Sequence, residues 1–139
     1  MQKNKPESKT LLVVDDDRVA CAFFETLLSR DGFQVEVVHD GESALNLMKS
    51  DAYHKFDLVI LDLMMPRYGG YEVLKELQHG DYQSVPIFIV TARALDDGAV
   101  EMIRTESNVQ EFWKKPVNAM EFRRKIHVAL GTLPQKPAP

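Results

Sequence analysis

The chain has 139 residues, a hydrophobic fraction of 45% and a net charge of −4. This length fits one domain, and the negative charge argues against a surface built throughout for nucleic acid. One cysteine excludes a disulfide framework or a thiolate metal site, and no apolar run approaches the roughly 20 residues that span a bilayer. We therefore expect a cytoplasmic domain with no membrane insertion and no direct nucleic-acid binding.

Short apolar runs alternate along the chain with segments of helical periodicity. The expected strands are Leu11–Val14, Val35–Val38, Leu58–Leu61, Ile87–Val90 and the shorter run Phe112-Trp113. Each expected helix carries apolar residues on one face, which are in chain order Val19, Ala20, Phe23, Phe24, Leu27 and Leu28; Ala44, Leu45 and Met48; Val73, Leu74 and Leu77; Ala99, Val100 and Ile103; and Phe122, Ile126, Ala129 and Leu130. Alternating strands and helices predict a parallel sheet covered on both faces.

The two ends of the chain differ in composition from its centre. Residues 1–9 are polar, and we expect a flexible N-terminal segment there. Residues 131–139 contain Pro134, Pro137 and Pro139, which cannot continue a helix, so this stretch is expected to be a tail or a truncated linker. The folded domain is expected to cover residues 10–130, with Asn118 as the N-cap of its last helix.

Carboxylates directly follow two of the expected strands. Asp62 ends the run Leu58–Leu61, while Asp15 and Asp16 follow Leu11–Val14. The carboxyl ends of parallel strands meet at one edge, where open α/β sheets bind their ligands. Carboxylates held close together raise one another's pKa values unless a cation neutralises them, and oxygen ligands suit Mg²⁺. Together with a hydroxyl and an ammonium group expected at the same edge, these carboxylates predict a site for a divalent cation and a phosphoryl group.

Each of these residues also has a simpler interpretation. The triplet Asp15-Asp16-Asp17 could merely cap the first helix, where acidic residues favour the helix dipole. Asp62 lacks that explanation, because Pro66 and Gly69-Gly70 separate it from the next helix.

A hydroxyl and an ammonium group are expected at the same edge. Thr91 follows Ile87–Val90 and could donate a hydrogen bond to a phosphoryl oxygen, although threonine at a strand end can be only a turn residue. Lys115 precedes Pro116 and could pair with a carboxylate at rest and with phosphoryl oxygens after transfer. A lysine at a strand end can also be a solvated charge, for which Lys114 is the natural candidate.

Five motifs, which follow one another along the chain, resemble those of a known family. They are Val14-Asp15-Asp16, Asp62-Leu63-Met64-Met65-Pro66, the following Gly70, Val90-Thr91-Ala92, and Phe112 with Lys115-Pro116. On these motifs, residues 10–130 resemble a response-regulator receiver domain of two-component signal transduction, similar to single-domain chemotaxis regulators. The resemblance implies a flavodoxin-like doubly wound (βα)5 fold. Its five-stranded parallel sheet would have the order 2-1-3-4-5, with helices on both faces.

The resemblance also implies roles for the acidic residues. Asp62 would accept a phosphoryl group from a phosphohistidine on a sensor histidine kinase or histidine phosphotransfer protein. Asp16, Asp62 and the backbone carbonyl of Met64 would bind Mg²⁺ directly, and Asp15 largely through metal-bound water. The chain would be a phosphoacceptor that catalyses its own phosphorylation and slow dephosphorylation, and not a classical enzyme.

The remaining motifs imply stabilisation and switching. Lys115 and Thr91 would stabilise the phosphorylated state. Thr91 and Phe112 would form a switch that changes the face made by the fourth helix, fifth strand and fifth helix, and so controls an unknown downstream protein. Met64 and Arg93, two residues after Asp62 and Thr91, would flank the phosphoryl group, and we expect them to tune its lifetime.

Two other functions compete with this interpretation. The opening Asp15-Asp16-Asp17 also resembles haloacid-dehalogenase-type phosphatases, with Asp15 as nucleophile and Asp17 as acid/base. That scheme needs a further acidic pair after Lys115 and leaves Asp62 unexplained. The second is a receiver-like interaction module that no longer takes phosphate, against which the intact set of acidic, hydroxyl and ammonium groups argues.

Overall fold

The computed structural model describes residues 5–50, 56–65, 69–92, 97–106 and 108–133. Its strands are β1 (Thr10–Val14), β2 (Gln34–Val38), β3 (Leu58–Leu61), β4 (Ile87–Thr91) and β5 (Val109–Lys114). Its α-helices are α1 (Arg18–Arg30), α2 (Gly41–Lys49), α3 (Gly70–Glu76), α4 (Asp97–Arg104) and α5 (Ala119–Leu130), and its 3₁₀ helices are η1 (Pro6–Ser8) and η2 (Gly80–Ser84).

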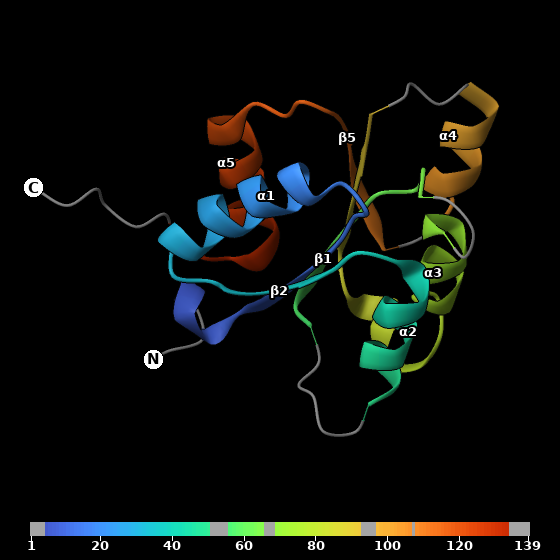
Figure 1. The fold of residues 1–139 in the computed structure, drawn as a ribbon, viewed down its shortest axis with the longest axis horizontal. Coiled ribbons are helices and arrows are strands. Elements are labelled where there is room, and N and C mark those ends of the chain that lie inside the picture. Colours follow the sequence, from blue (N-terminus) through green and yellow to red (C-terminus); the bar gives the residue numbers. More distant parts are fainter. Residues whose placement is uncertain (1–4, 51–55, 66–68, 93–96, 107, 134–139) are drawn as a thin grey trace, which may run out of the picture.

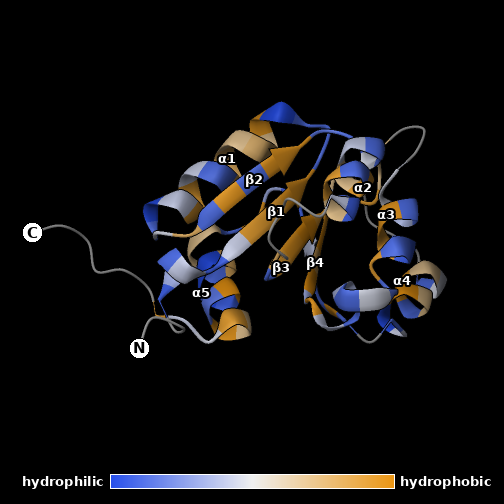
Figure 2. Cartoon of the chain, turned by 90° about the horizontal axis from the view of Figure 1, so that it is seen from below, coloured by the Kyte–Doolittle hydropathy of each residue, from blue (hydrophilic) through white to orange (hydrophobic). Residues whose placement is uncertain are grey.

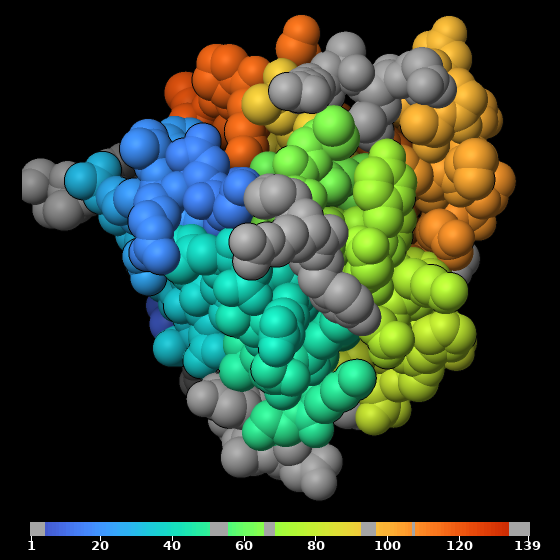
Figure 3. All heavy atoms as spheres, turned by 45° about the vertical axis from the view of Figure 1, so that its right-hand side comes forward, coloured from blue at the N-terminus to red at the C-terminus, as the bar shows by residue number. Residues whose placement is uncertain are grey.

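All five strands are parallel and lie in the order β2-β1-β3-β4-β5. Figure 1 shows this sheet between two layers of helices, with α1 and α5 on one face and α2, α3 and α4 on the other. The space-filling view shows α2, α3 and α4 following one another across their face (Figure 3). The expected fold class and strand order are therefore confirmed.

The alternation of side chains along the strands divides the core into two clusters. Leu11 and Val13 of β1 pack with α1 and α5, whereas Leu12 and Val14 pack with α2, α3 and α4. Figure 2 shows β1, β3 and β4 as almost continuously hydrophobic, which is the composition of strands covered on both faces. The edge strands β2 and β5 are only half-buried and carry polar residues.

The expected apolar faces of α2, α3, α4 and α5 are buried or half-buried, but the expected face of α1 is partly wrong. Phe24 and Leu28 are buried, yet Val19 is 80% exposed and Phe23 is 39% exposed. Cys21 takes part in the buried stripe instead. Because successive helical residues are turned by about 100°, the stripe centred on Phe24 and Leu28 leaves Val19 and Phe23 at its solvent margin.

Both ends of the domain have defined structure close to the sheet. Pro6 of η1 is buried, and the Gln34 amide donates a hydrogen bond to the Lys9 carbonyl. Asn118 caps α5 as expected, because its side chain accepts a hydrogen bond from the Glu121 amide. Among the described residues, every helix is too short or too polar to cross a membrane.

Candidate functional site

Backbone hydrogen bonds continue beyond the last residues of the strands and fix the side chains that follow. The Asp15 amide donates to the Val38 carbonyl at 3.2 Å, and the Asp62 amide donates to the Val14 carbonyl at 3.0 Å. Where β4 and β5 end, the Lys115 amide donates a hydrogen bond to the Thr91 carbonyl at 2.9 Å. The sheet register itself therefore brings the predicted residues to one edge.

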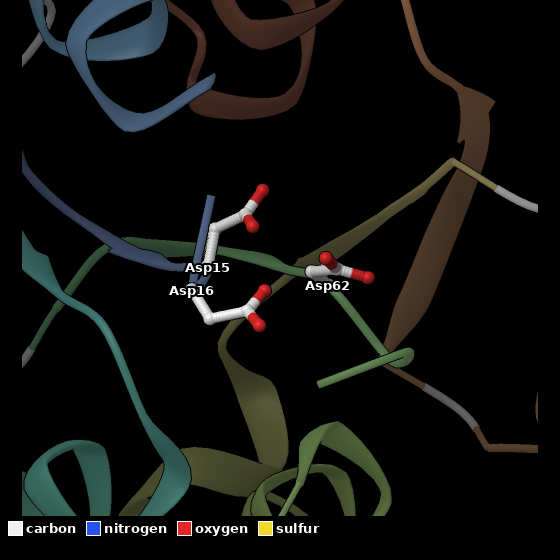
Figure 4. A group of neighbouring side chains, drawn as sticks. All are labelled: Asp15, Asp16 and Asp62. Carbon is white, nitrogen blue, oxygen red and sulfur yellow. The ribbon is translucent and has the colours of Figure 1, made fainter. Parts of the chain in front are cut away.

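Three carboxylates meet at this edge. One oxygen each from Asp15, Asp16 and Asp62 lies within 4.8 Å of the others. The carboxylates of Asp15 and Asp16 extend toward the side on which Asp62 lies (Figure 4). Asp15 and Asp62 are buried and Asp16 is exposed, so the group opens to solvent on one side. An all-oxygen set of this size fits a hard divalent cation such as Mg²⁺.

Lys115 connects the two buried carboxylates. Its Nζ lies 2.6 Å from Asp15 Oδ2 and 3.3 Å from Asp62 Oδ2. The lysine side chain is 13% exposed, so these charges interact with little screening by water. We call Asp15, Asp16, Asp62 and Lys115 the acidic cluster. Three carboxylates share one ammonium, and the cluster therefore has excess negative charge.

The pKa values follow from this charge imbalance and from burial. Burial, together with the negative charge of Asp62, raises the pKa of Asp15 to about 6, although Lys115 and the Asp17 amide act to lower it. Burial by itself would lower the pKa of Lys115, but hydrogen bonds and charges of Asp15 and Asp62 more than offset this, and the pKa is raised. The ammonium thus stays charged, while the Asp15 carboxylate lacks sufficient compensation.

The loop after β3 is shaped around Asp62. The Met64 amide donates a hydrogen bond of 2.9 Å to Asp62 Oδ1, which orients the carboxylate. Gly70 begins α3 directly behind it. A Cβ atom at Gly70 would lie 2.2 Å from the Asp62 carbonyl oxygen and 2.5 Å from the Leu63 Cα, so only glycine permits this approach.

The predicted switch residues occupy two neighbouring strands. Thr91 ends β4 and is 6% exposed, and Phe112 on β5 is half-buried against the α2–α4 core. The Arg104 guanidinium of α4 lies 5.1 Å from the centre of the Phe112 ring, a cation–π contact that the sequence pattern did not reveal. Arg93 lies outside the described residues.

The remaining aspartate of the triplet has a separate structural role. Asp17 Oδ1 accepts hydrogen bonds from the amides of Val19 and Ala20, which makes Asp17 the N-cap of α1. Its own amide donates to Asp15 Oδ1 at 2.9 Å. Thus the capping interpretation holds for Asp17, whereas Asp15 and Asp16 lie in the acidic cluster.

A second ionic group, which sequence reasoning missed, lies where α1 and α5 end. Asp31 accepts hydrogen bonds from Arg123 Nε and Nη2 and, at 2.7 Å, from His127 Nε2. His127 Nδ1 lies 2.7 Å from Thr132 Oγ1. We call these four residues the Asp31 cluster. An aspartate at the C-terminal end of a helix opposes the helix dipole, and this was the available signal for a cationic partner.

The fold and this edge define a doubly wound α/β domain with an acidic, lysine-bridged site. A family model described as the response regulator receiver domain matches residues 11–127. The transcriptional regulatory protein CpxR of Klebsiella pneumoniae is 36% identical over 120 residues, which are 86% of this chain and 48% of that protein. The response regulator MprA of Mycobacterium tuberculosis is 34% identical over 123 residues, 88% of this chain and 51% of that protein.

Solved structures agree with these relatives. The receiver domain of sensor histidine kinase PA1611 from Pseudomonas aeruginosa PAO1, with magnesium coordinated in its active-site cleft, superimposes with a TM-score of 0.75 at 26% identity, covering 88% of this chain and 98% of that one. The chain therefore belongs to the response regulator receiver domain family of two-component systems. It spans about half the length of the curated relatives that it matches.

Proposed function

We propose that this domain accepts a phosphoryl group on Asp62 from a phosphohistidine, in a reaction that depends on Mg²⁺. The observation that carries the proposal is Lys115 Nζ, which lies between the carboxylates of Asp15 and Asp62 at 2.6 and 3.3 Å. An ammonium in this position can pair with the unphosphorylated carboxylate at rest and with phosphoryl oxygens after transfer.

The carboxylates of Asp15, Asp16 and Asp62, with the backbone carbonyl of Met64, would hold the Mg²⁺ ion. When bound, the ion supplies positive charge that offsets repulsion between the carboxylates and the phosphoryl oxygens. The magnesium-containing receiver domain of the Pseudomonas kinase supports this assignment. The uncompensated negative charge of the acidic cluster gives an independent reason for a cation.

Transfer would be an in-line displacement at phosphorus. One Asp62 carboxylate oxygen forms a bond to phosphorus while the phosphorus–nitrogen bond of the donor histidine breaks, and its electron pair returns to the imidazole nitrogen. The Met64 amide holds the Asp62 carboxylate in one orientation. Lys115 and Thr91 then donate to the transferred group, so that catalysis is largely positioning and charge neutralisation.

The donor would be a sensor histidine kinase or a histidine phosphotransfer protein that reaches the site over α1. Val19 and Phe23, which are exposed there, line an open apolar hollow together with Pro116 and Val117, next to Lys115. Exposed apolar side chains beside a reaction site are suited to contact a partner protein.

The output would be a change in the α4–β5–α5 face. Thr91 and Phe112 lie next to this face, and Arg104 of α4 covers the Phe112 ring. Movement of Thr91 toward the phosphoryl group would free space for the ring to turn inward and would release Arg104. The downstream partner would then recognise a shifted population of this face. Equal affinity of that partner for the free and phosphorylated forms would contradict this part of the proposal.

The lifetime of the phosphorylated state would depend on Met64 and Arg93. Met64 is 40% exposed and follows Asp62 closely, so its side chain can limit access of the attacking water. We expect Met64→Asn to change the rate of dephosphorylation, measured as loss of phosphorylated mass over time. An unchanged rate would remove Met64 from this role.

Incubation with acetyl phosphate, followed by intact mass spectrometry, tests the function. We expect a gain of one phosphoryl group that requires Mg²⁺ and disappears in Asp62→Asn. A phosphatase that uses Asp15 would instead keep its labelling in Asp62→Asn. A wild-type protein that gains no mass would support the interaction module that takes no phosphate.

A further inference from the structure

Two side chains that sequence analysis left unassigned hold the backbone of the acidic cluster. The Asp15 carbonyl oxygen lies 3.1 Å from Cys21 Sγ of α1 and 3.2 Å from His39 Nδ1, which follows β2. A carbonyl oxygen only accepts hydrogen bonds and has two lone pairs. Both the thiol and the imidazole must therefore be donors, and the His39 proton must lie on Nδ1.

The contact between Cys21 and His39 agrees with this assignment. Their Sγ and Nδ1 atoms are 3.6 Å apart, because both approach the same oxygen. Cys21 is buried, and burial raises the pKa of its thiol to about 11, so that the thiol keeps the proton it donates. Cys21 and His39 thus donate two hydrogen bonds to the carbonyl oxygen of one peptide group.

That peptide group joins Asp15 to Asp16. Since a peptide is planar, holding the carbonyl oxygen of Asp15 also fixes the amide nitrogen and Cα of Asp16. The Asp15 amide is bound to Val38, and the Asp15 carboxylate is bound to Lys115 and to the Asp17 amide. Asp16 is exposed, and its carboxylate lies close to those of Asp15 and Asp62 although the three negative charges repel one another. Fixing this peptide therefore fixes the Cα atom from which the Asp16 side chain extends toward the other two carboxylates.

We propose that His39 and Cys21 are positioning residues for the cation site, which act by holding the Asp15 carbonyl and thereby aligning the Asp16 carboxylate. This inference rests on the proposed binding of Mg²⁺ by the acidic cluster. Neither residue is among those proposed to hold the cation or the phosphoryl group. Their effect is that the site is already arranged before the cation arrives, so less binding free energy is spent on ordering it.

Matched substitutions separate the donor role from simple packing. In His39→Asn the side-chain amide nitrogen can occupy the place of Nδ1, because both nitrogens are bonded to Cγ, whereas His39→Ala loses the donor. Cys21→Ser keeps a donor of similar size, and Cys21→Ala loses it. Magnesium chloride alone serves as the probe, with its dissociation constant measured by isothermal titration calorimetry at one fixed pH.

We expect His39→Ala and Cys21→Ala each to weaken Mg²⁺ binding about fivefold, which is the effect of one lost hydrogen bond. His39→Asn and Cys21→Ser should retain binding within about twofold of wild type. Thermal unfolding without Mg²⁺, recorded for the same proteins, should not follow this donor pattern.

Two outcomes would overturn the inference while leaving the proposed function intact. One is wild-type Mg²⁺ affinity in both alanine variants, and the other is equal weakening by His39→Ala and His39→Asn. By contrast, a wild-type protein that binds no Mg²⁺, or binds it as well after Asp16→Asn, would refute the proposed cation site and this inference with it.

Discussion

The acidic cluster and the Asp31 cluster are ionic groups that each contain buried carboxylates, but their charges are balanced differently. In the acidic cluster three carboxylates share the ammonium of Lys115. In the Asp31 cluster one carboxylate receives hydrogen bonds from the Arg123 guanidinium and the His127 ring. The first lies where the strands end. The second lies at the opposite edge, between the end of α1 and the end of α5.

The pKa shifts of the two buried aspartates point in opposite directions. Burial raises the pKa of Asp15 to about 6. Burial also acts to raise the pKa of Asp31, but Arg123 and His127 outweigh it, and that pKa is lowered. An uncompensated carboxylate costs stability in the free protein and attracts a cation, whereas a compensated one stabilises the fold. We therefore interpret the acidic cluster as the proposed binding site and the Asp31 cluster as a structural element.

The largest expected effect on stability is at the Asp31 cluster. Asp31→Asn removes the negative charge that faces the buried His127 and the partly buried Arg123, and it replaces one of the two acceptor oxygens by an NH2 donor. We expect a loss of about 3 kcal/mol in the free energy of unfolding. Urea denaturation measures this value. Glu25→Gln, the same charge change on the exposed side of α1, is the control and should change stability by less than about 0.5 kcal/mol. Equal stability of the two variants would refute the structural role.

The second prediction concerns pH, and the two clusters should respond in opposite ways. Asp15 has a folded pKa of about 6, above the ordinary value of 3.8. Its contribution to stability is therefore fully present below 3.8 and is lost as the pH rises through about 6. Asp31 has a lowered folded pKa. The contribution of Asp31 to stability is present above the ordinary pKa of an aspartate, and it is lost as the pH falls through the lowered pKa of the folded protein.

Cation binding makes the Asp15 effect directly measurable. Because Mg²⁺ competes with the proton on Asp15, its affinity should fall up to about tenfold per pH unit below a midpoint of about 6. Titration calorimetry across this range tests the prediction. A Mg²⁺ affinity that does not change through this range would mean that Asp15 is already ionised, and would remove the charge argument for the site.

The smallest expected effect is a gain in stability. Asp15→Asn removes one of the carboxylates that share Lys115, and we expect the metal-free protein to be more stable by about 1 kcal/mol at neutral pH. The same variant should bind Mg²⁺ more weakly. Urea denaturation with and without Mg²⁺ measures both effects. A destabilisation like that of Asp31→Asn would show that the two clusters do not differ as proposed.

The sequence predicted what depends on local pattern and parallel topology. Apolar runs followed by Asp15, Asp62 and Thr91 were enough to expect the sheet and the edge at which these residues meet. The exposure of Val19 and Phe23 was missed, because periodicity gives the apolar stripe of α1 but not the angle at which that helix lies on the sheet.

The side-chain contacts that sequence reasoning missed depend on how helices pack in three dimensions. Asp31 and His127 are 96 positions apart, and only the packing of α1 beside α5 brings them together. The contact of Arg104 with Phe112 likewise requires the position of α4. The hydrogen bonds of His39 and Cys21 to a backbone carbonyl leave no pattern in the sequence, since any side-chain donor of similar length could form them.

The most direct test locates the phosphorylated residue. After incubation with acetyl phosphate and Mg²⁺, borohydride reduces an aspartyl phosphate to homoserine, and peptide mass spectrometry identifies its position. We expect homoserine at position 62, and none when Mg²⁺ is removed. Homoserine at position 15, or none in the presence of Mg²⁺, would contradict it.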